Sequence, residues 1–254
     1  MTVSLRTPDG MGVSGGYDGL DDSEPAARTT LADPRALGVL VAAIALAIAL
    51  TAVPNWPVGV FQDDGIYVIL GKALATGEGY RYLNLPGAPY ATHYPPGYPL
   101  FLALLWKLSP QFPQNVGLFT FASAGFLALA AFGTFRFAHG RLGLSSLGAA
   151  VVAIAGSVSM PAIIFGVFAL SEPMFMALLL PVLIYAERVS DRAGWRDALF
   201  VGLAGGALAM VRTTAMFVVP AFALVLLFRR RVVPAVSAVA GCAVFLVPWH
   251  LWVA

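Results

Sequence analysis

Long apolar stretches alternate with short polar ones along most of this chain, and their lengths predict membrane-spanning helices. A helix needs about 20 apolar residues to cross ~30 Å of hydrocarbon. Candidate spans cover residues 36–53, 116–138, 145–168, 173–186, 195–211, 213–228 and 232–252. The pattern therefore predicts an all-α integral membrane protein with about seven transmembrane helices and a long first external loop, residues 54–114.

Two shorter stretches in that loop predict interfacial helices. Residues 98–108 would reach only ~16 Å as a helix, and prolines lie on both sides of them, so this stretch does not span. Before it, apolar residues recur at helical spacing after Asp63, and a helix there would end at Gly77 and Gly79. We expect both helices to lie at the membrane surface.

The basic residues support this count, because Lys and Arg gather in cytoplasmic loops. If residues 98–108 do not cross, the basic clusters all fall on one side: Arg28, Arg35, Arg136, Arg141, Arg188, Arg192, Arg196, Arg229, Arg230 and Arg231. We therefore expect a multi-pass plasma-membrane protein with a cytoplasmic N-terminus. The Ala-, Val- and Gly-rich spans favour a bacterial membrane.

Composition narrows the class further. Hydrophobic residues make up 59% of the 254 residues and charged residues 11%, against about 25% charged in soluble domains. A net charge of +2, spread in short clusters, is no nucleic-acid footprint. The single cysteine, Cys242, excludes an intrachain disulfide and a cysteine-based metal site.

The chain divides into two regions. Residues 1–34 are polar and predict a disordered cytoplasmic tail, and residues 35–254 form the membrane module. We expect the protein to continue beyond this sequence, because Pro248, Trp249 and Trp252 lie where the last helix leaves the membrane.

The first candidate site is the acid pair Asp63 and Asp64, just after the first span. A carboxylate at the bilayer centre costs about 2.5–3.5 kcal/mol, so the pair lies at the membrane edge, where ionisable groups are functional candidates. A structural interpretation also fits: Asp63 would be the N-cap of its helix and Asp64 would lie in the first turn. His93 and Tyr94 follow in a stretch that prolines stiffen.

Glu172 and Arg212 are the second candidate pair, at the external ends of two predicted spans. Ser171-Glu172-Pro173 makes a good helix start, with Ser171 as N-cap, but Glu172 could also face a polar cavity. Arg212 breaks the positive-inside pattern. A forked guanidinium suits a phosphate, and the alternative is that Arg212 reaches out to lipid headgroups.

Together these residues resemble the GT-C glycosyltransferases, above all the protein O-mannosyltransferases and the lipid A aminoarabinose transferases. The resemblance covers residues 36–254 and rests on the order and shared side of the following residues: Asp63, Asp64, Tyr67, Tyr94-Pro95-Pro96-Gly97-Tyr98, Glu172, Arg212 and Pro248-Trp249. It implies that Asp63 is the catalytic carboxylate. Better-known members have Glu where this chain has Asp64, and the aminoarabinose transferases have Lys-Pro near His93-Tyr94-Pro95.

The function that this resemblance implies is sugar transfer from a polyprenyl phosphate to an acceptor hydroxyl on the external face. Asp63 would take the proton and Arg212 would hold the phosphate, with His93 and Lys72 as weaker candidates for that contact. Attack opposite the leaving group would invert the anomeric centre. Asp64 and Glu172 would orient the acceptor or hold a divalent cation, which would want several oxygen ligands.

The acceptor stays open at this point: a protein, a glycolipid or an envelope glycan. Two other classes also stay open. A transporter would carry charges near mid-membrane, broken helices and inverted repeats, whereas here no acid lies in the middle of a predicted span and the charges gather at one face. A non-catalytic lipid-binding protein would tolerate loss of Asp63.

Overall fold

The computed structural model describes residues 33–54, 58–192 and 194–254, and the described part folds into helices without a β-strand. An isolated antiparallel bridge pairs Arg81 with Tyr90. The predicted tail 1–34 falls almost wholly outside the described residues. The helices are α1 (Pro34–Thr51), α2 (Gln62–Thr76), α3 (Gly97–Leu108), α4 (Val116–Gly140), α5 (Ser146–Ser157), α6 (Met160–Val167), α7 (Glu172–Ser190), α8 (Trp195–Val211), η1 (Thr213–Phe217), α9 (Val218–Phe228) and α10 (Val232–Val253).

Several of these helices have the length and composition of membrane spans, which confirms the all-α membrane class. In the described residues, α1, α4, α7 and α10 are long and apolar enough to cross, and α5 with α6 makes a fifth candidate if this bent pair is one span. Helix α8 has 17 residues, or ~26 Å, at the short end of the spanning range. The apolar helical stretch Thr213–Phe228 is also shorter than a typical span. The seven-span count stays a prediction.

The predicted span 145–168 is wrong as one continuous helix. Helix α5 ends at Ser157, α6 begins at Met160, and their axes differ by 63°. Pro161 lies in the first turn of α6, where its missing N–H costs nothing, but the same ring would remove a hydrogen bond from an uninterrupted helix. The prediction of one continuous helix rested on the uninterrupted hydrophobicity of this stretch. Pro161 was the sequence signal for the break between α5 and α6.

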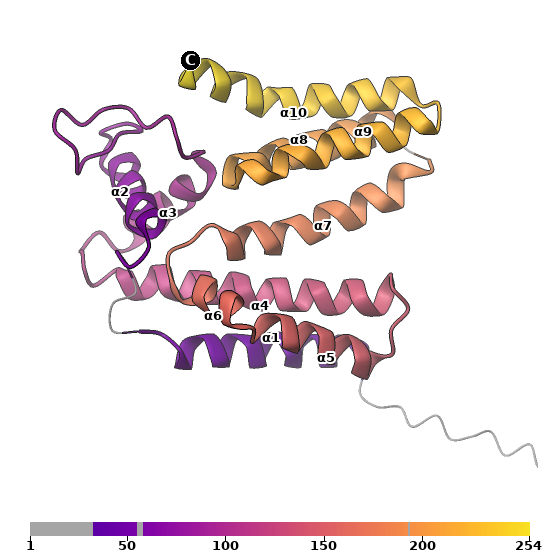
Figure 1. The fold of residues 1–254 in the computed structure, drawn as a ribbon, viewed down its shortest axis with the longest axis horizontal. Helices are drawn as coiled ribbons and strands as arrows, with labels where there is room; N and C mark the ends of the chain where they lie inside the picture. The colour runs from indigo at the N-terminus through magenta and orange to yellow at the C-terminus, as the bar shows by residue number, and fades with distance from the viewer. Residues whose placement is uncertain (1–32, 55–57, 193) are drawn as a thin grey trace, which may run out of the picture. The chain divides into compact units, whose positions relative to one another are not determined.

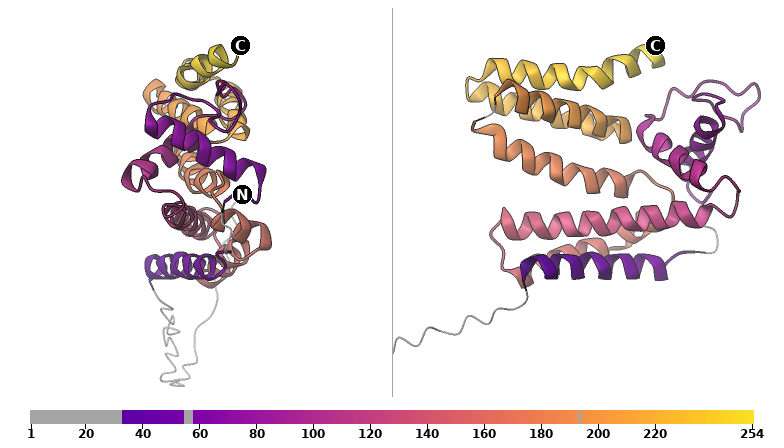
Figure 2. Two further views of the ribbon diagram at one scale, coloured as in Figure 1. Left: turned by 90° about the vertical axis from the view of Figure 1, so that its left-hand side faces the viewer. Right: turned by 180° about the vertical axis from the view of Figure 1, so that it is seen from behind.

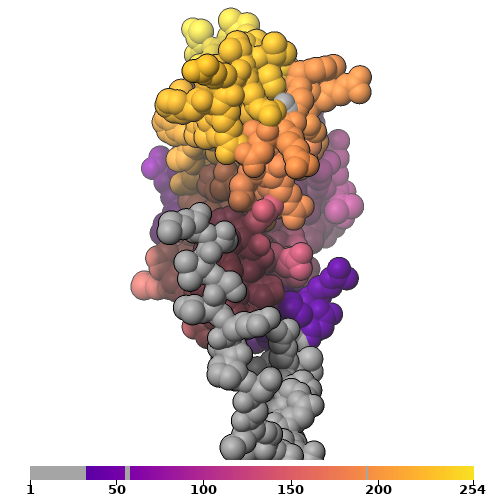
Figure 3. All heavy atoms as spheres, turned by 90° about the vertical axis from the view of Figure 1, so that its right-hand side faces the viewer, coloured from indigo at the N-terminus to yellow at the C-terminus, as the bar shows by residue number. Residues whose placement is uncertain are grey.

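The long helices lie side by side, and consecutive stretches run in alternate directions (Figure 1). Helices α2 and α3 lie across one end of this array, as the turned views show (Figure 2). The turns from α4 to α5, from α7 to α8 and from α9 to α10 lie at the opposite end, which faces the viewer in Figure 3. These turns carry the predicted basic clusters, so the arginines of residues 141, 192 and 229–231 share one end of the array.

One apolar core fixes α2 and α3 against the ends of the long helices. It contains Tyr67 and Val68 of α2, Tyr98 and Leu102 of α3, and Val211 at the end of α8. The Trp106 indole N–H of α3 donates to the backbone oxygen of Val68 at 3.3 Å. The loop elements are therefore held by burial and not only by the chain that links them.

The last helix also holds the loop. The Trp252 indole N–H donates to the Ala91 backbone oxygen at 3.0 Å, across 161 residues of sequence. Trp252 packs edge-on against Tyr90, with ring centroids 5.1 Å apart. Trp249 packs edge-on against Tyr80, with ring centroids 6.4 Å apart. The two tryptophans at the end of α10 thus contact the loop that carries the acid pair.

Candidate active site

The start of α2 separates the roles of the two adjacent acids. The N-cap of α2 is Phe61, so the prediction of Asp63 as N-cap is wrong; Asp63 is the second helical residue and Asp64 the third. The Asp64 carboxylate is completely buried and accepts the backbone N–H groups of Gly59, Val60 and Gly65 at 2.8, 3.2 and 2.7 Å. Like the third residue of a capping box, Asp64 accepts N–H groups that precede it in the chain, here those of Gly59 and Val60 just before the N-cap. Asp64 therefore holds the chain that enters the helix.

Asp63 is half-buried and points elsewhere. Its Oδ1 accepts the phenol O–H of Tyr94 at 2.7 Å. Tyr94 is itself held by Tyr80, whose O–H donates to the Tyr94 backbone oxygen at 2.7 Å. Burial and the bond to Asp63 raise the pKa of Tyr94, so the phenol stays protonated and keeps donating. A carboxylate has about four acceptor positions, so this bond leaves Asp63 able to accept from a substrate hydroxyl.

Tyr67 links this carboxylate to the long helices. Its ring packs edge-on against the rings of Tyr94 and Tyr98, with centroids 5.2 and 5.0 Å away. Its O–H shares a 3.2 Å hydrogen bond with the Ser171 hydroxyl. Burial raises the pKa of Tyr67, and the negative charges of Asp63 and Glu172 act in the same direction. Tyr67 is therefore a neutral bridge.

Ser171 joins Tyr67 to the predicted pair at the helix ends. Arg212 Nη1 donates to the Ser171 hydroxyl at 3.3 Å and forms an ion pair with Glu172 Oε1 at 2.7 Å. The side chain of Arg212 is 34% exposed and that of Glu172 is 19% exposed. The two residues are brought together, and Arg212 is not a free cation. Its Nη2 and Nε groups still offer N–H donors to an oxyanion.

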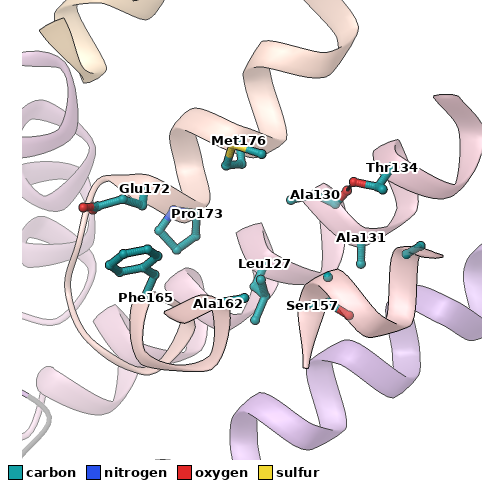
Figure 4. Close-up of a pocket in the computed structure, with 12 residues that line it drawn as sticks. Leu127, Ala130, Ala131, Thr134, Ser157, Ala162, Phe165, Glu172, Pro173 and Met176 are labelled. Carbon is teal, nitrogen blue, oxygen red and sulfur yellow. Dashed lines mark hydrogen bonds between the residues drawn. The ribbon is translucent and has the colours of Figure 1, made fainter. Parts of the chain in front are cut away.

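Glu172 also lines a small, mainly apolar pocket of about 180 Å³. Figure 4 shows the carboxylate of Glu172 directed away from Leu127 and Ala162 in that pocket. The carboxylate pairs with Arg212 instead, and the hydroxyls of Thr134 and Ser157 in the pocket donate to backbone oxygens of their own helices.

Of the two remaining candidates, His93 is close to Asp63 and Lys72 is not. The His93 ring packs against Tyr94 at 4.9 Å and lines the same cavity as Asp63. Lys72 is exposed, with its ammonium 6.0 Å from the centre of the Trp106 ring of α3. The structure places Lys72 on a different face of α2 from the acids.

Asp64 and Glu172, the acids that were candidates to hold a divalent cation, both have other partners. Three backbone N–H groups occupy the Asp64 carboxylate, and Arg212 pairs with Glu172. Among the described residues, no group of three or more His, Cys, Asp and Glu side chains converges on one point. We therefore assign no step to a metal.

Two unlike surfaces meet at this network. The first, the loop cavity, has a volume of about 750 Å³ and is lined by Gly59, Phe61, Gln62, Asp63, Gly65, Ile66, Ile69, Tyr82, Asn84, Leu85, His93 and Tyr94. The second, the α7–α8 groove, has a volume of about 450 Å³ and is lined by Met174, Leu178, Pro181, Val182, Tyr185, Phe200, Val201, Ala204, Ala207, Leu208 and Val211. The groove is mainly apolar, and two of its lining residues, Met174 and Val211, lie two positions after Glu172 and directly before Arg212 in the chain.

Ser171 is the functional candidate that the sequence did not give. It is completely buried and occupies the N-cap position of α7, as predicted, but its side chain makes no cap bond. Its hydroxyl instead contacts residues 104 and 41 positions away. A helix-start motif was the only signal, and it indicated a local role.

The chain matches no protein-family model, no curated protein and no solved structure.

Proposed function

We propose that this protein is a membrane glycosyltransferase that moves a sugar from a polyprenyl-phosphate donor to an acceptor hydroxyl. One observation carries the proposal: a carboxylate facing a polar cavity and a guanidinium whose residue directly follows the lining of an apolar groove in the chain belong to one connected cluster. Tyr94, Tyr67 and Ser171 make the connection. A transferase that joins an amphiphilic donor to a polar acceptor needs these two surfaces next to each other.

The groove supports an amphiphilic donor. Its lining is apolar over helices α7 and α8, which suits an isoprenoid chain, and Arg212 lies where an anionic headgroup would end that chain. Glu172 holds Arg212 in place and also lowers the local positive charge. A sugar phosphate of single charge fits this partly neutralised site better than a diphosphate does.

The chemistry follows from the two charged groups. Asp63 takes the proton of the acceptor hydroxyl as its oxygen attacks the anomeric carbon. The carbon–oxygen bond to the phosphate breaks, and its electron pair leaves with the phosphate, which Arg212 stabilises. Attack from the side opposite the phosphate inverts the anomeric centre. The face carrying α2 and α3 would be external, with seven crossings and the basic turns in the cytoplasm.

The test is Asp63→Asn, which keeps the shape of the side chain and removes the base. With the protein in lipid, labelled polyprenyl-phosphate sugars and crude envelope acceptors, we expect transfer to fall by about 10²–10⁴-fold. Glu78→Gln is the matched control, because Glu78 is an exposed acid of the same loop outside the cavity. Transfer at the native rate by Asp63→Asn would remove Asp63 from catalysis. No transfer by the native protein with any donor would favour a transporter or a lipid-binding protein.

Arg212 is tested through donor binding. The double variant Arg212→Gln, Glu172→Gln removes both charges, so that neither is left unpaired. Loss of a charged hydrogen bond costs about 1.5–3 kcal/mol, so we expect donor affinity to fall by about 10- to 100-fold. Lys107→Ala, which removes an exposed cation of α3, is expected to bind the donor normally. Equal affinity of the double variant and the native protein would place the phosphate elsewhere.

A further inference from the structure

The loop cavity has a lining suited to one class of acceptor. Amide groups of Gln62 and Asn84, the phenols of Tyr82 and Tyr94 and the imidazole of His93 all border it. Each of these groups donates and accepts hydrogen bonds while neutral. The lining can therefore bind a ligand that carries many hydroxyls.

The charge of the cavity argues against a phosphorylated acceptor. Asp63 is its one carboxylate, and no Lys or Arg lines it among the described residues. Lys72 and Arg81 both point elsewhere: Lys72 lies against Trp106, and Arg81 stacks on Tyr90 with its guanidinium carbon 3.9 Å from the ring centre. An anionic headgroup would meet Asp63 with no Lys or Arg beside it, and His93 would be the one lining residue able to carry a positive charge.

Apolar surface is interleaved with these polar groups. Phe61, Ile66, Ile69 and Leu85 border the same cavity. Sugar rings present C–H faces beside their hydroxyls, so they can use an aromatic or aliphatic wall and an amide at once. The volume of about 750 Å³ also lies within the ~300–1,000 Å³ of small-molecule sites.

We infer that the loop cavity binds the neutral saccharide end of the acceptor, so that the sugar is added to a glycan and not to a peptide or a phosphorylated glycolipid. The inference rests on the proposed glycosyltransferase function. One acceptor hydroxyl would lie at Asp63, and Asn84 and Gln62 would bind the neighbouring hydroxyls. Tyr94 keeps Asp63 directed at the cavity through its 2.7 Å bond.

Binding is measured without the donor, so that it does not depend on transfer. The whole chain in lipid nanodiscs is mixed with neutral hexose and pentose disaccharides, and saturation-transfer NMR reports contact. We expect at least one disaccharide to bind, and its 6-phosphorylated form to bind at least tenfold more weakly. Asn84→Ala should weaken binding at least fivefold, whereas Gln114→Ala, an exposed amide outside the cavity, should not.

Asp63→Asn tests whether the negative charge of Asp63 repels a phosphorylated ligand. With the carboxylate gone, we expect the affinity for the phosphorylated disaccharide to rise at least threefold while the neutral one stays bound. Phosphorylated and neutral forms that bind equally to the native protein would overturn the charge argument.

Transfer assays separate this inference from the proposed function. Transfer to a peptide or a lipid, without binding of any disaccharide, would overturn the inference and leave the glycosyltransferase intact. Disaccharide binding that depends on Asn84, with no transfer from any donor, would support a saccharide site and overturn the glycosyltransferase.

Discussion

Asp63 and Asp64 are adjacent and chemically alike, yet their surroundings give them opposite tasks. Asp64 is completely buried and accepts three backbone N–H groups, whereas Asp63 is half-buried, borders a cavity and accepts one phenol. The helix explains the difference, because successive residues point about 100° apart around its axis. The sequence suggested a functional pair; the structure separates one candidate base from one structural acid.

Because the two acids have different partners, replacing each of them is predicted to change the stability of the protein by a different amount. Asp64→Ala removes the buried carboxylate that accepts three part-buried backbone N–H groups, and loss of a hydrogen bond to a charged group costs about 1.5–3 kcal/mol. We expect its melting temperature in detergent to fall by several degrees and the Asp63→Ala value to stay near native. Thermal unfolding followed by tryptophan fluorescence measures both. Equal melting temperatures for the two variants would show that the Asp64 bonds contribute little.

At the scale of elements, the contact between α3 and α8 positions the site. Gly97, the first residue of α3, lies directly against the backbone at the end of α8. A Cβ placed there would lie 2.6 Å from the Met210 oxygen and 2.8 Å from the Val211 nitrogen. Backbone atoms cannot rotate away as a side chain can. The absence of a side chain at Gly97 therefore sets how closely α3 approaches Arg212.

Gly97→Ala is predicted to separate α3 from α8. Overpacking of this kind costs about 1–3 kcal/mol, and the shift would move Arg212 relative to Tyr67. We expect lower thermal stability together with weaker donor binding. Gly125→Ala in α4 is the control, because a Cβ there meets nothing within 4 Å and the change favours a helix. If Gly97→Ala behaved like Gly125→Ala, the close contact would not be needed.

Helix positions followed from hydrophobicity, but helix breaks and long-range partners did not. The predicted stretch 195–211 coincides with α8, and α4 and α10 differ from their predictions by one or two residues at one end. Hydrophobicity does not report the break at Pro161 or the 3₁₀ turn η1 after Arg212. Nor can it find Ser171 as a partner of Tyr67, because that pairing depends on how α2 packs against the start of α7.

For the whole molecule, the separation of charges predicts its orientation. The basic turns and the α2–α3 end lie at opposite ends of the array (Figure 1). In a Cys242→Ser background, Asn84→Cys should react with an impermeant maleimide in intact cells, and Arg192→Cys only after permeabilisation. Both positions are exposed, so burial does not limit labelling. Reaction of both from the same side would contradict the interfacial placement of α3 or the three predicted crossings between α3 and residue 192.

The contact between Trp252 and Ala91 has a consequence for biosynthesis. The two residues are 161 positions apart, and the loop that carries Asp63 packs against Trp249 and Trp252 of the last helix. At ~5–20 residues per second, a ribosome adds that length in roughly ten to thirty seconds. Throughout that interval the nascent loop lacks its tryptophan partners. The last contacts that hold this loop therefore form only when α10 has been made, so an unfinished chain would hold the loop that carries Asp63 less firmly.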